Sequence, residues 1–552
     1  MININRIIDC FFIGHNEMEF TEYEKKVRSM GIKSGAYRDL NLNFLQSKNK
    51  LYTVSDIYNS FSGTQKPLNL GETFSATIAY LGTYLHRRNL SFDFVVSFQE
   101  EKEKIKEILQ NNIIHAVAIP TTLYTSAFPI IEIVSFIRRY SPKVKIIIGG
   151  PFVSTNIRTQ NEDTLQFILK SINADYYINS SQGEETLVKL LNAISQRLNV
   201  ESVPNIYIKK IDYYLKTPIK IEDNKLSDNM VDWNLFKGRL EKFVAMRTAI
   251  SCPFSCAFCG FPQHAGKYQI VDISNIEYEL DALKSIGTVE SINFIDDTFN
   301  VPPERFKEIL RMMIRKKYNF KWHSYFRCQF ADEEMIELMK ESGCEGVFLG
   351  IESGSQRILN NMHKLVKIED YYRGHRLLND YNILTFDSFI VGFPGETQET
   401  VNETLQFIEE LHPTFYRAQL WYCEPITPIW QSREKYGILG SQFEWEHNTM
   451  KAYEGSDWIE YLLLNVKNSI WLPQYNFDFV NIFHLLRRDM SLEEIKKMIY
   501  LFSKGLQEKI INPNSREISF DIMKQLKDIF RKEDNNKIEE IITEYSAEFE
   551  FL

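Results

Sequence analysis

The stretch SCPFSCAFCG, residues 251–260, places Cys252, Cys256 and Cys259 on one short loop with a C-x3-C-x2-C spacing. Thiolates are the usual protein ligands of iron–sulfur clusters, and three of them can hold three irons of a [4Fe–4S] cluster. The fourth iron then has no protein ligand and stays open to a small molecule. This stretch therefore predicts a cluster that takes part in catalysis, inside a fold that the rest of the chain must supply.

The composition is ordinary for a globular enzyme. The chain has 552 residues, of which 44% are hydrophobic and 25% charged, so we expect two or three domains with sizeable cores. The formal net charge of −9 argues against broad binding to nucleic acids or to anionic membranes. No apolar run in the sequence approaches the roughly 18 residues that span a bilayer.

The other four cysteines, Cys10, Cys328, Cys344 and Cys423, are scattered along the chain and bring the total to an odd seven. Scattered single thiols fit a reducing compartment better than a disulfide framework. The first residues, MININR, lack the charged-then-apolar layout of a signal peptide. We therefore expect a cytoplasmic protein.

The N-terminal part alternates strand-like and helix-like patterns. Predicted strands lie at 7–13, 92–97, 116–120, 145–150 and 175–178, the last of the series. Such alternation favours a parallel, doubly wound sheet, in which ligands bind beyond the carboxyl ends of the strands. Small polar segments follow these predicted ends, at 14–16, 121–122, 149–151 and 180–183. We expect a binding crevice there.

A second alternation begins near residue 241. Predicted strands lie at 243–249, 291–295, 321–326, 347–349, 385–391 and 417–422. Six strand–helix units predict a partial (β/α)6 barrel, with function at the carboxyl ends of its strands. The expected α/β organisation is a Rossmann-like domain at 1–205, a linker at 206–240, the barrel at 241–430 and a mainly helical region at 431–552.

The cysteine loop within this barrel pattern resembles the radical SAM superfamily. The resemblance implies that S-adenosylmethionine (SAM) chelates the open iron and is cleaved to a 5′-deoxyadenosyl radical. Phe258 matches the family's aromatic position, whose backbone and ring contact the adenine. The alternative is a zinc clip with His264 as the nearest fourth ligand, although zinc normally takes its ligands from two separated pairs.

The N-terminal part resembles the cobalamin-binding domain that precedes the barrel in one branch of this superfamily. The resemblance rests on KIIIGGP at 145–151 and GEETLVKLL at 183–191. It implies a cobalamin site, for which the strand-end residues are the candidates: Thr121, Thr122, Gly149, Gly150, Ser181, Gly183 and Glu184. No Asp-x-His-x-x-Gly motif is present, which fits a branch whose cobalt often lacks a lower protein ligand. A Rossmann-like domain for another nucleotide remains the alternative.

The segments DCFFIGHNEM at 9–18, SGAYRDLN at 34–41 and residues 251–266 look like the phosphinothricin P-methyltransferase-like family. This resemblance implies a cobalamin-dependent radical SAM methyltransferase that acts on an unactivated carbon or a phosphinate phosphorus. Methyl transfer would use methylcobalamin and a 5′-deoxyadenosyl radical. The substrate would be small or carrier-bound, and an external donor such as flavodoxin or ferredoxin would supply electrons.

Three further residues at predicted strand ends are candidates for binding SAM. Asp297 stands where the superfamily often binds the methionine amino group, and capping of the next helix is its alternative role. Glu352 matches a position that hydrogen-bonds the ribose, unless it is a structural carboxylate of the glycine turn. Arg327 could face the substrate or the SAM carboxylate, or pair with an acid on the barrel rim.

Two other functions remain open at this point. A cobalamin-dependent radical SAM enzyme could catalyse a rearrangement without methyl transfer. A non-catalytic cluster- or cobalamin-binding sensor is the less favoured possibility.

Overall fold

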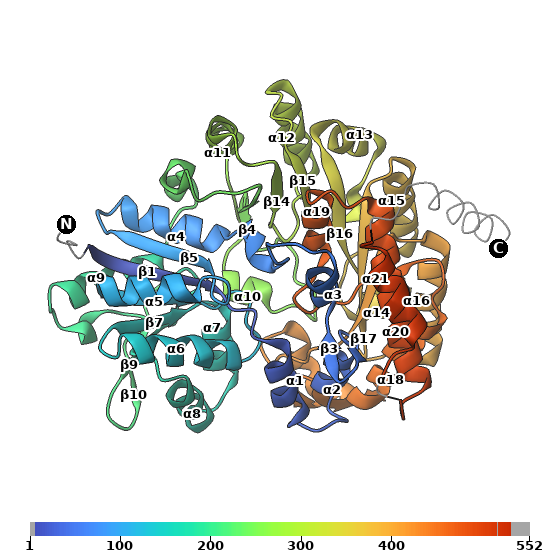
Figure 1. The fold of residues 1–552 in the computed structure, drawn as a ribbon, viewed down its shortest axis with the longest axis horizontal. Coiled ribbons are helices and arrows are strands. Elements are labelled where there is room, and N and C mark those ends of the chain that lie inside the picture. The colour runs from blue at the N-terminus through green and yellow to red at the C-terminus, as the bar shows by residue number, and fades with distance from the viewer. Residues whose placement is uncertain (1–5, 516, 532–552) are drawn as a thin grey trace.

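The computed structural model describes residues 6–515 and 517–531. Two large sheets lie side by side, each flanked by helices (Figure 1). The first comes from the N-terminal part of the chain, and the second forms an open barrel in the remainder. In the described part of the chain, no helix combines the length and the apolar character needed to cross a membrane.

The N-terminal sheet has seven strands in the order β10-β9-β8-β7-β6-β1-β5. Their bounds are β1 Ile7–His15, β5 Phe92–Ser97, β6 Ile113–Pro120, β7 Lys145–Gly149, β8 Tyr176–Ile178, β9 Ile206–Lys209 and β10 Tyr214–Lys216. The five strands from β5 to β8 are parallel, and β9 and β10 add on antiparallel. The predicted doubly wound sheet is therefore confirmed.

Helices cover both faces of this sheet because its strands are apolar on both faces. Phe11 and Ile13 pack into one core, whereas the alternate residues Cys10 and Phe12 pack into the other. The covering helices are α4 Ala76–His86, α5 Lys102–Asn111, α6 Phe128–Tyr140, α7 Pro151–Thr159, α8 Glu162–Ile172 and α9 Glu184–Ser195.

The barrel sheet has eight parallel strands in the order β22-β18-β17-β16-β15-β14-β11-β4. The six predicted strands are β11 Phe243–Met246, β14 Ser291–Phe294, β15 Lys321–Phe326, β16 Cys344–Glu352, β17 Leu384–Val391 and β18 Phe415–Leu420. The edge strands are β4 Thr73–Phe74 and β22 Ile470–Trp471. The predicted partial barrel is confirmed, and distant segments extend it at both edges.

Helices surround the barrel, and one of them covers it near the amino ends of its strands. The outer helices are α11 Ile273–Ile286, α12 Pro303–Arg315, α13 Glu333–Ser342, α14 Gln356–Asn361, α15 Ile368–Asp380 and α16 Gln398–Leu411. Helix α19, Phe479–Leu486, reaches the inner face of β15, where Phe483 stacks on the buried ring of His323 at 4.4 Å. The open end of the barrel therefore lies at the carboxyl ends of its strands.

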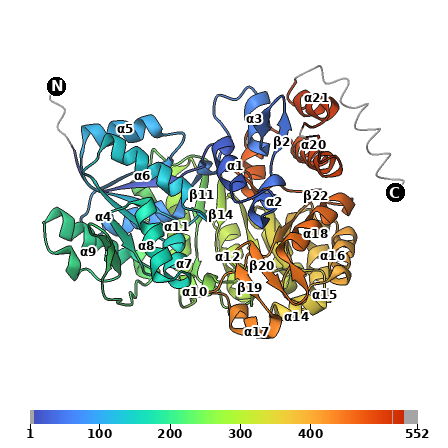
Figure 2. The same ribbon diagram turned by 90° about the horizontal axis from the view of Figure 1, so that it is seen from below.

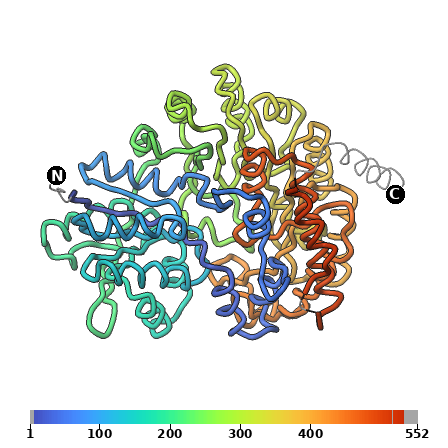
Figure 3. The backbone as a smooth tube through the Cα atoms, in the orientation of Figure 1, coloured from blue at the N-terminus to red at the C-terminus, as the bar shows by residue number. Residues whose placement is uncertain are grey.

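Residues 16–75 leave the first sheet and cross to the barrel (Figures 1 and 3). They form α1 Phe20–Arg28, α2 Gly35–Asn41, β2 Leu45–Ser47, β3 Lys50–Tyr52, α3 Val54–Phe61 and η1 Leu70–Glu72 before β4. Figure 2 shows α3 and β2 beside the C-terminal helices α20 (Leu492–Ile511) and α21 (Phe520–Asp528). Arg38 of α2 forms an ion pair with Glu460 at 2.6 Å. This crossing segment ties the two halves together.

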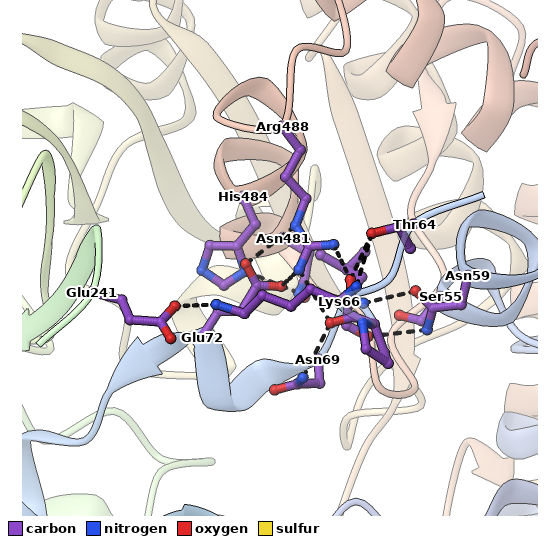
Figure 4. A network of polar contacts seen from close by, with 12 residues as sticks. Ser55, Asn59, Thr64, Lys66, Asn69, Glu72, Glu241, Asn481, His484 and Arg488 are labelled. Atoms are coloured by element: carbon purple, nitrogen blue, oxygen red, sulfur yellow. Dashed lines mark hydrogen bonds and ion pairs between the residues drawn. The ribbon is translucent and has the colours of Figure 1, made fainter. Parts of the chain in front are cut away.

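A polar network fastens the crossing segment to the loop after α19 (Figure 4). Arg488 binds the Glu72 carboxylate and donates to the carbonyls of Lys66 and Pro67. The Thr73 hydroxyl is 2.9 Å from Nε2 of His484. The network holds η1 and β4 at the barrel edge.

One expected boundary needs correction. The segment 206–240 was expected to be a linker, but β9 and β10 extend the N-terminal sheet, so the strand at 175–178 is not the last one. Their short length hides them from a pattern search. The described part of the region 431–552 contains the helices α17 (Arg433–Tyr436), α18 (Ala452–Asn465) and α19–α21. A small sheet of β19 Leu439–Ser441, β20 Glu444–His447 and β21 Met450–Lys451 lies among them, and β22 joins the barrel edge. Residues 516 and 532–552 of this region lie outside the described residues. The remaining domain limits stay predictions.

Candidate functional site

The cysteine loop begins directly after β11, at the carboxyl end of that strand. Asp296, which follows β14, is buried and accepts hydrogen bonds from the backbone N–H groups of Thr248 (2.6 Å) and Ala249 (2.9 Å). Its second oxygen accepts the Thr248 hydroxyl. Burial raises the pKa of this carboxyl, and the three hydrogen bonds oppose that shift. Asp296 thus anchors the start of the loop.

Two backbone hydrogen bonds hold the middle of the loop against the barrel. Ala257 donates to the carbonyl of Met362 at 2.8 Å, and Ile429 donates to the carbonyl of Ala257 at 2.9 Å. The short strands β12 (Ala249–Ile250) and β13 (Gln269–Ile270), which flank the loop, pair with each other antiparallel. The loop is therefore held at both ends and in the middle.

The three thiols of the loop differ in burial. Cys256 is buried, whereas Cys252 and Cys259 are half-buried. Desolvation raises the pKa of Cys252 and raises that of Cys259 to about 12, so without a metal these thiols stay protonated at neutral pH. A bound cationic cluster would reverse this, since a coordinating thiol is deprotonated.

The loop offers three thiols as donors, the residue type that usually holds iron–sulfur clusters. Among residues 6–515 and 517–531, no group of three or more His, Cys, Asp and Glu side chains is arranged to hold one metal ion. A cluster binds each thiolate to a different iron, so its ligands stand farther apart than around a single zinc. His264, the possible fourth zinc ligand, has both ring nitrogens bonded to the hydroxyls of Ser154 and Thr155.

A buried charged group lies beside the loop. Glu352, at the end of β16, pairs with Lys364 at 2.8 Å, and both side chains are about nine-tenths buried. The Lys364 ammonium lies 5.5 Å from the ring centroid of Phe258. This places Glu352 and Phe258, two predicted SAM-binding residues, around one ammonium group. Glu352 has a φ of +71°, a costly backbone conformation for a non-glycine residue.

Arg327 follows β15 on the same side of the barrel. Its guanidinium donates to the carbonyl of Lys364 at 2.8 Å and lies 3.7 Å from the ring centroid of Phe254. Its Nε is buried and has no hydrogen-bond partner in the described structure. Arg327 therefore packs on the cysteine loop, and no described carboxylate forms the rim ion pair considered above.

Asp297 follows β14 but does not cap the next helix. Helix α12 begins at Pro303 with Pro302 as its cap, so the capping alternative is wrong. The Asp297 side chain is accessible, yet surrounding protein and the Asp296 carboxylate raise its pKa to about 7. An accessible carboxyl in desolvated surroundings can bind a cation.

In the N-terminal sheet, Thr121, Gly149 and Gly150 meet where β6 and β7 end. The Thr121 hydroxyl and N–H both lie 2.8 Å from the carbonyl of Gly149, to which they donate. Gly150 has a φ of +110°, and a Cβ there would lie 2.9 Å from the Thr121 hydroxyl. The space that a side chain at Gly150 would fill is therefore occupied by Thr121 of the protein itself.

The other predicted cobalamin-side residues differ in exposure. Thr122 and Ser181 are exposed, whereas Gly183 is buried and is the N-cap of α9, with a φ of +85°. Glu184 is buried and accepts from Asn224 at 3.1 Å. Thr122 and Ser181 are thus free to meet a ligand, whereas Glu184 has a partner within the protein.

Helix α7, which follows β7, and the loop after β8 lie against the segment that follows the cysteines. Helix α10, Phe261–Ala265, contacts α7 through His264. A Cβ on Gly266 would be 3.8 Å from the Ser181 hydroxyl. The fold therefore brings the strand ends of both sheets together at residues 260–266.

Lys364 and the anchoring role of Asp296 were missed by the sequence analysis. Lys364 lies in the loop between α14 and α15, and no motif marks it. The pair at 296–297 was visible, but which carboxylate is buried depends on the direction of each side chain at the strand end.

Comparison with known proteins agrees with this arrangement. The sequence model of the Radical SAM superfamily matches residues 246–408. An uncharacterized methyltransferase of Pyrococcus horikoshii is 24% identical over 301 residues, 53% of this chain and 64% of that protein. The anaerobic magnesium-protoporphyrin IX monomethyl ester cyclase of Rubrivivax gelatinosus is 23% identical over 64% of this chain and 65% of the cyclase. This chain thus spans less than two thirds of either relative.

Two solved structures share the fold across nearly the whole chain. The methyltransferase TsrM from Kitasatospora setae, with cobalamin and a [4Fe-4S] cluster bound, has a TM-score of 0.60 and 15% identity, covering 95% of this chain and 99% of TsrM. The cobalamin-dependent enzyme OxsB, with aqua-cobalamin and SAM bound, has a TM-score of 0.55 and 13% identity, covering 99% of this chain and 81% of OxsB. Residues 246–408 therefore form a radical SAM domain, and the chain has the two-sheet fold of the cobalamin-dependent radical SAM enzymes TsrM and OxsB.

Proposed function

We propose that this protein is a cobalamin-dependent radical SAM methyltransferase. The observation that carries the proposal is the position of the cysteine loop. The loop stands at the carboxyl end of β11, and the segment after it touches the loops beyond β7 and β8 of the other sheet. Two ligands bound at these two sets of strand ends would face one another across a single substrate space.

On the barrel side, Cys252, Cys256 and Cys259 would hold a [4Fe–4S] cluster. With SAM bound at its open iron, the cluster would supply the one electron that reduces the sulfonium group of SAM and gives a carbon radical. Phe258 and Glu352 would orient the adenosine part, and Asp297 would accept from the amino group. Arg327, lying on Phe254 at 3.7 Å, would keep the loop closed over the site and exclude water.

On the N-terminal side, the strand-end residues would hold cobalamin. They are Thr121, Thr122, Gly149, Gly150, Ser181, Gly183 and Glu184. Cobalamin would supply a transferable methyl group at its cobalt. The exposed Thr122 and Ser181 would contact the ligand directly, whereas Thr121 and Gly150 shape the turn beneath it.

The substrate would be a small or carrier-bound molecule with an unactivated carbon or a phosphinate phosphorus. An external donor such as flavodoxin or ferredoxin would supply electrons, and a cytoplasmic location fits this chemistry. The Pyrococcus relative and the hopanoid C-2 methylase of Rhodopseudomonas palustris, 28% identical over 202 residues, support the methyltransferase class.

The test is product analysis of the anaerobically reconstituted protein with SAM, cobalamin and a reductant. With a methyl acceptor present, we expect 5′-deoxyadenosine and S-adenosylhomocysteine in comparable amounts. No cluster after reconstitution, or no SAM cleavage by the reduced protein, would contradict the proposal.

Relatives named as anaerobic magnesium-protoporphyrin IX monomethyl ester cyclases favour a second candidate function. A cobalamin-dependent radical SAM enzyme that does not transfer a methyl group would release 5′-deoxyadenosine without S-adenosylhomocysteine tied to product. The same product analysis therefore separates the two functions.

A further inference from the structure

The contact between α10 and α7 is a direct polar link between the two sheets. Nδ1 of His264 is 3.0 Å from the Ser154 hydroxyl, and Nε2 is 3.2 Å from the Thr155 hydroxyl. Arg158, one turn further along α7, donates to the carbonyl of Gln263. A single imidazole therefore bonds two consecutive residues of a helix in the other half of the molecule.

A neutral ring satisfies both of these hydroxyls, because a neutral imidazole donates from one nitrogen and accepts at the other. The Ser154 hydroxyl also lies 3.2 Å from the carbonyl of Pro151, which can take its proton. Burial and the nearby Arg158 guanidinium lower the pKa of His264 to about 4. The ring is therefore neutral under ordinary conditions, and both hydrogen bonds can form at once.

On the cluster side, His264 holds a short helix that begins two residues after the third cysteine. The N–H of Phe261, the first residue of α10, donates to Sγ of Cys259 at 3.4 Å. Gly260 has no space for a side chain, since a Cβ would lie 2.7 Å from Ile426 and 3.1 Å from a Glu424 oxygen. A shift of α10 therefore changes the hydrogen bond to the sulfur, and such bonds tune the potential of an iron–sulfur cluster.

On the other side, α7 follows the turn at Gly150 without an intervening loop. Ser154 is four residues beyond Gly150, and its backbone N–H donates to the Gly150 carbonyl at 3.1 Å. A Cβ on Gly150 would lie 2.9 Å from the hydroxyl of Thr121, the residue directly after the neighbouring strand β6. Any ligand that moves this turn moves the first turn of α7, and with it the two hydroxyls that His264 binds.

We infer that His264 is a positioning residue that couples the two proposed cofactor sites. It holds α10 against α7. A movement of the Gly150 turn therefore changes the hydrogen bond from the Phe261 N–H to the Cys259 sulfur. The inference rests on the proposed function. Coupling of this kind is reciprocal, so cobalamin would alter the cluster and the cluster would alter the affinity for cobalamin.

The experiment measures the cobalamin dissociation constant of the full-length protein with the cluster loaded and after the iron is removed. It also measures the midpoint potential of the cluster with and without hydroxocobalamin. For the unaltered protein we expect the two dissociation constants to differ by about 5-fold or more, the lower end of ordinary allosteric coupling. We also expect a cobalamin-dependent shift of the midpoint potential.

In His264→Ala, the ratio of dissociation constants should fall to about one, and the shift in potential should be lost. His264→Gln, which keeps one polar partner for the hydroxyls, should restore part of both. Thr159→Val is the matched control, because its hydroxyl lies on α7 but bonds only to the carbonyl of Thr155. This control should behave like the unaltered protein.

The double variant Ser154→Ala/Thr155→Val tests the link from the other side and leaves residues 251–267 unchanged. It must show the same loss, even if His264→Ala fails to assemble a cluster. A ratio of dissociation constants near one in the unaltered protein would overturn this inference but not the proposed function. An unchanged ratio in the double variant would have the same consequence. A protein that binds neither cofactor would instead overturn the proposed function.

Discussion

Both sheets are built around parallel strands but carry different chemistry at the carboxyl ends of those strands. Where β6 and β7 end, Thr121, Gly149 and Gly150 are uncharged and interact through backbone atoms and one hydroxyl. Where the barrel strands end, Asp296 and Glu352 are buried ionisable groups, and Lys364, from the loop between α14 and α15, is buried beside Glu352. A buried charge is costly unless it is paired, so buried charges are retained chiefly at positions where they serve a function.

This difference indicates two modes of recognition. The uncharged turns after β6 and β7 suit a large, preassembled ligand that is held by shape and backbone contacts. The charged barrel rim suits a ligand with its own ammonium and carboxylate groups, as SAM has. The following predictions test whether the two sides really divide the work in this way.

The largest effect is expected at the cysteines. Changing Cys252, Cys256 or Cys259 to alanine should abolish the visible absorbance of the cluster and reduce SAM cleavage to background, because three ligands are the minimum for this site. Cobalamin binding should survive, though weakened if the sites are coupled. Cys344→Ala, which changes a buried thiol outside the loop, is the control. A cysteine variant that retains turnover would contradict the assignment.

The next effect is expected at the buried ion pair. Glu352→Gln leaves the Lys364 ammonium buried without its partner, which should lower the free energy of unfolding by about 3–5 kcal/mol. Urea denaturation of the cluster-free protein measures this. The double variant Glu352→Gln/Lys364→Met should regain most of the loss. A loss below about 1 kcal/mol, typical of an exposed pair, would mean that solvent reaches the pair.

A smaller effect is expected at the turn of the first sheet. Gly150→Ala should lower the free energy of unfolding by about 1–3 kcal/mol, because φ is +110° and the new Cβ meets Thr121. Gly31→Ala separates the two causes, since Gly31 has a φ of +107° and no atom within 4 Å of the added Cβ. Equal losses in the two variants would show that the contact with Thr121 is unimportant.

The smallest effect is a pH dependence from Asp297, whose pKa in the folded protein is about 7. Between its ordinary pKa and about 7, the folded state holds a proton that the unfolded state has lost, so this group lowers stability as pH rises. The carboxylate that can accept from an ammonium forms only above that range.

We therefore expect the affinity for a non-cleavable SAM analogue to rise from about pH 6 to about pH 8. Isothermal titration calorimetry on the cluster-loaded protein measures the affinity. In Asp297→Asn, the affinity for the analogue should rise less between about pH 6 and about pH 8 than in the unaltered protein. The same profile in both proteins would show that Asp297 does not bind the analogue's amino group.

Much of the fold could be predicted from the sequence, because its signals are local. The runs at 7–13 and 145–150 became β1 and β7, and the six barrel strands lie where apolar runs predicted them. The strands β4, β9, β10 and β22 were not found. They are two to four residues long and are stabilised by pairing with distant strands, which leaves no periodic pattern.

The sequence by itself determined the three cysteines, their spacing and the α/β alternation that surrounds them. These follow from ligand chemistry and from the period of apolar residues, and both signals lie within short segments of the sequence. Only the tertiary structure decided that Asp296 anchors the loop while Asp297 stays accessible, that Lys364 pairs with Glu352, and that His264 meets Ser154 and Thr155. Such contacts join residues up to 110 positions apart, and their existence depends on packing rather than on local pattern.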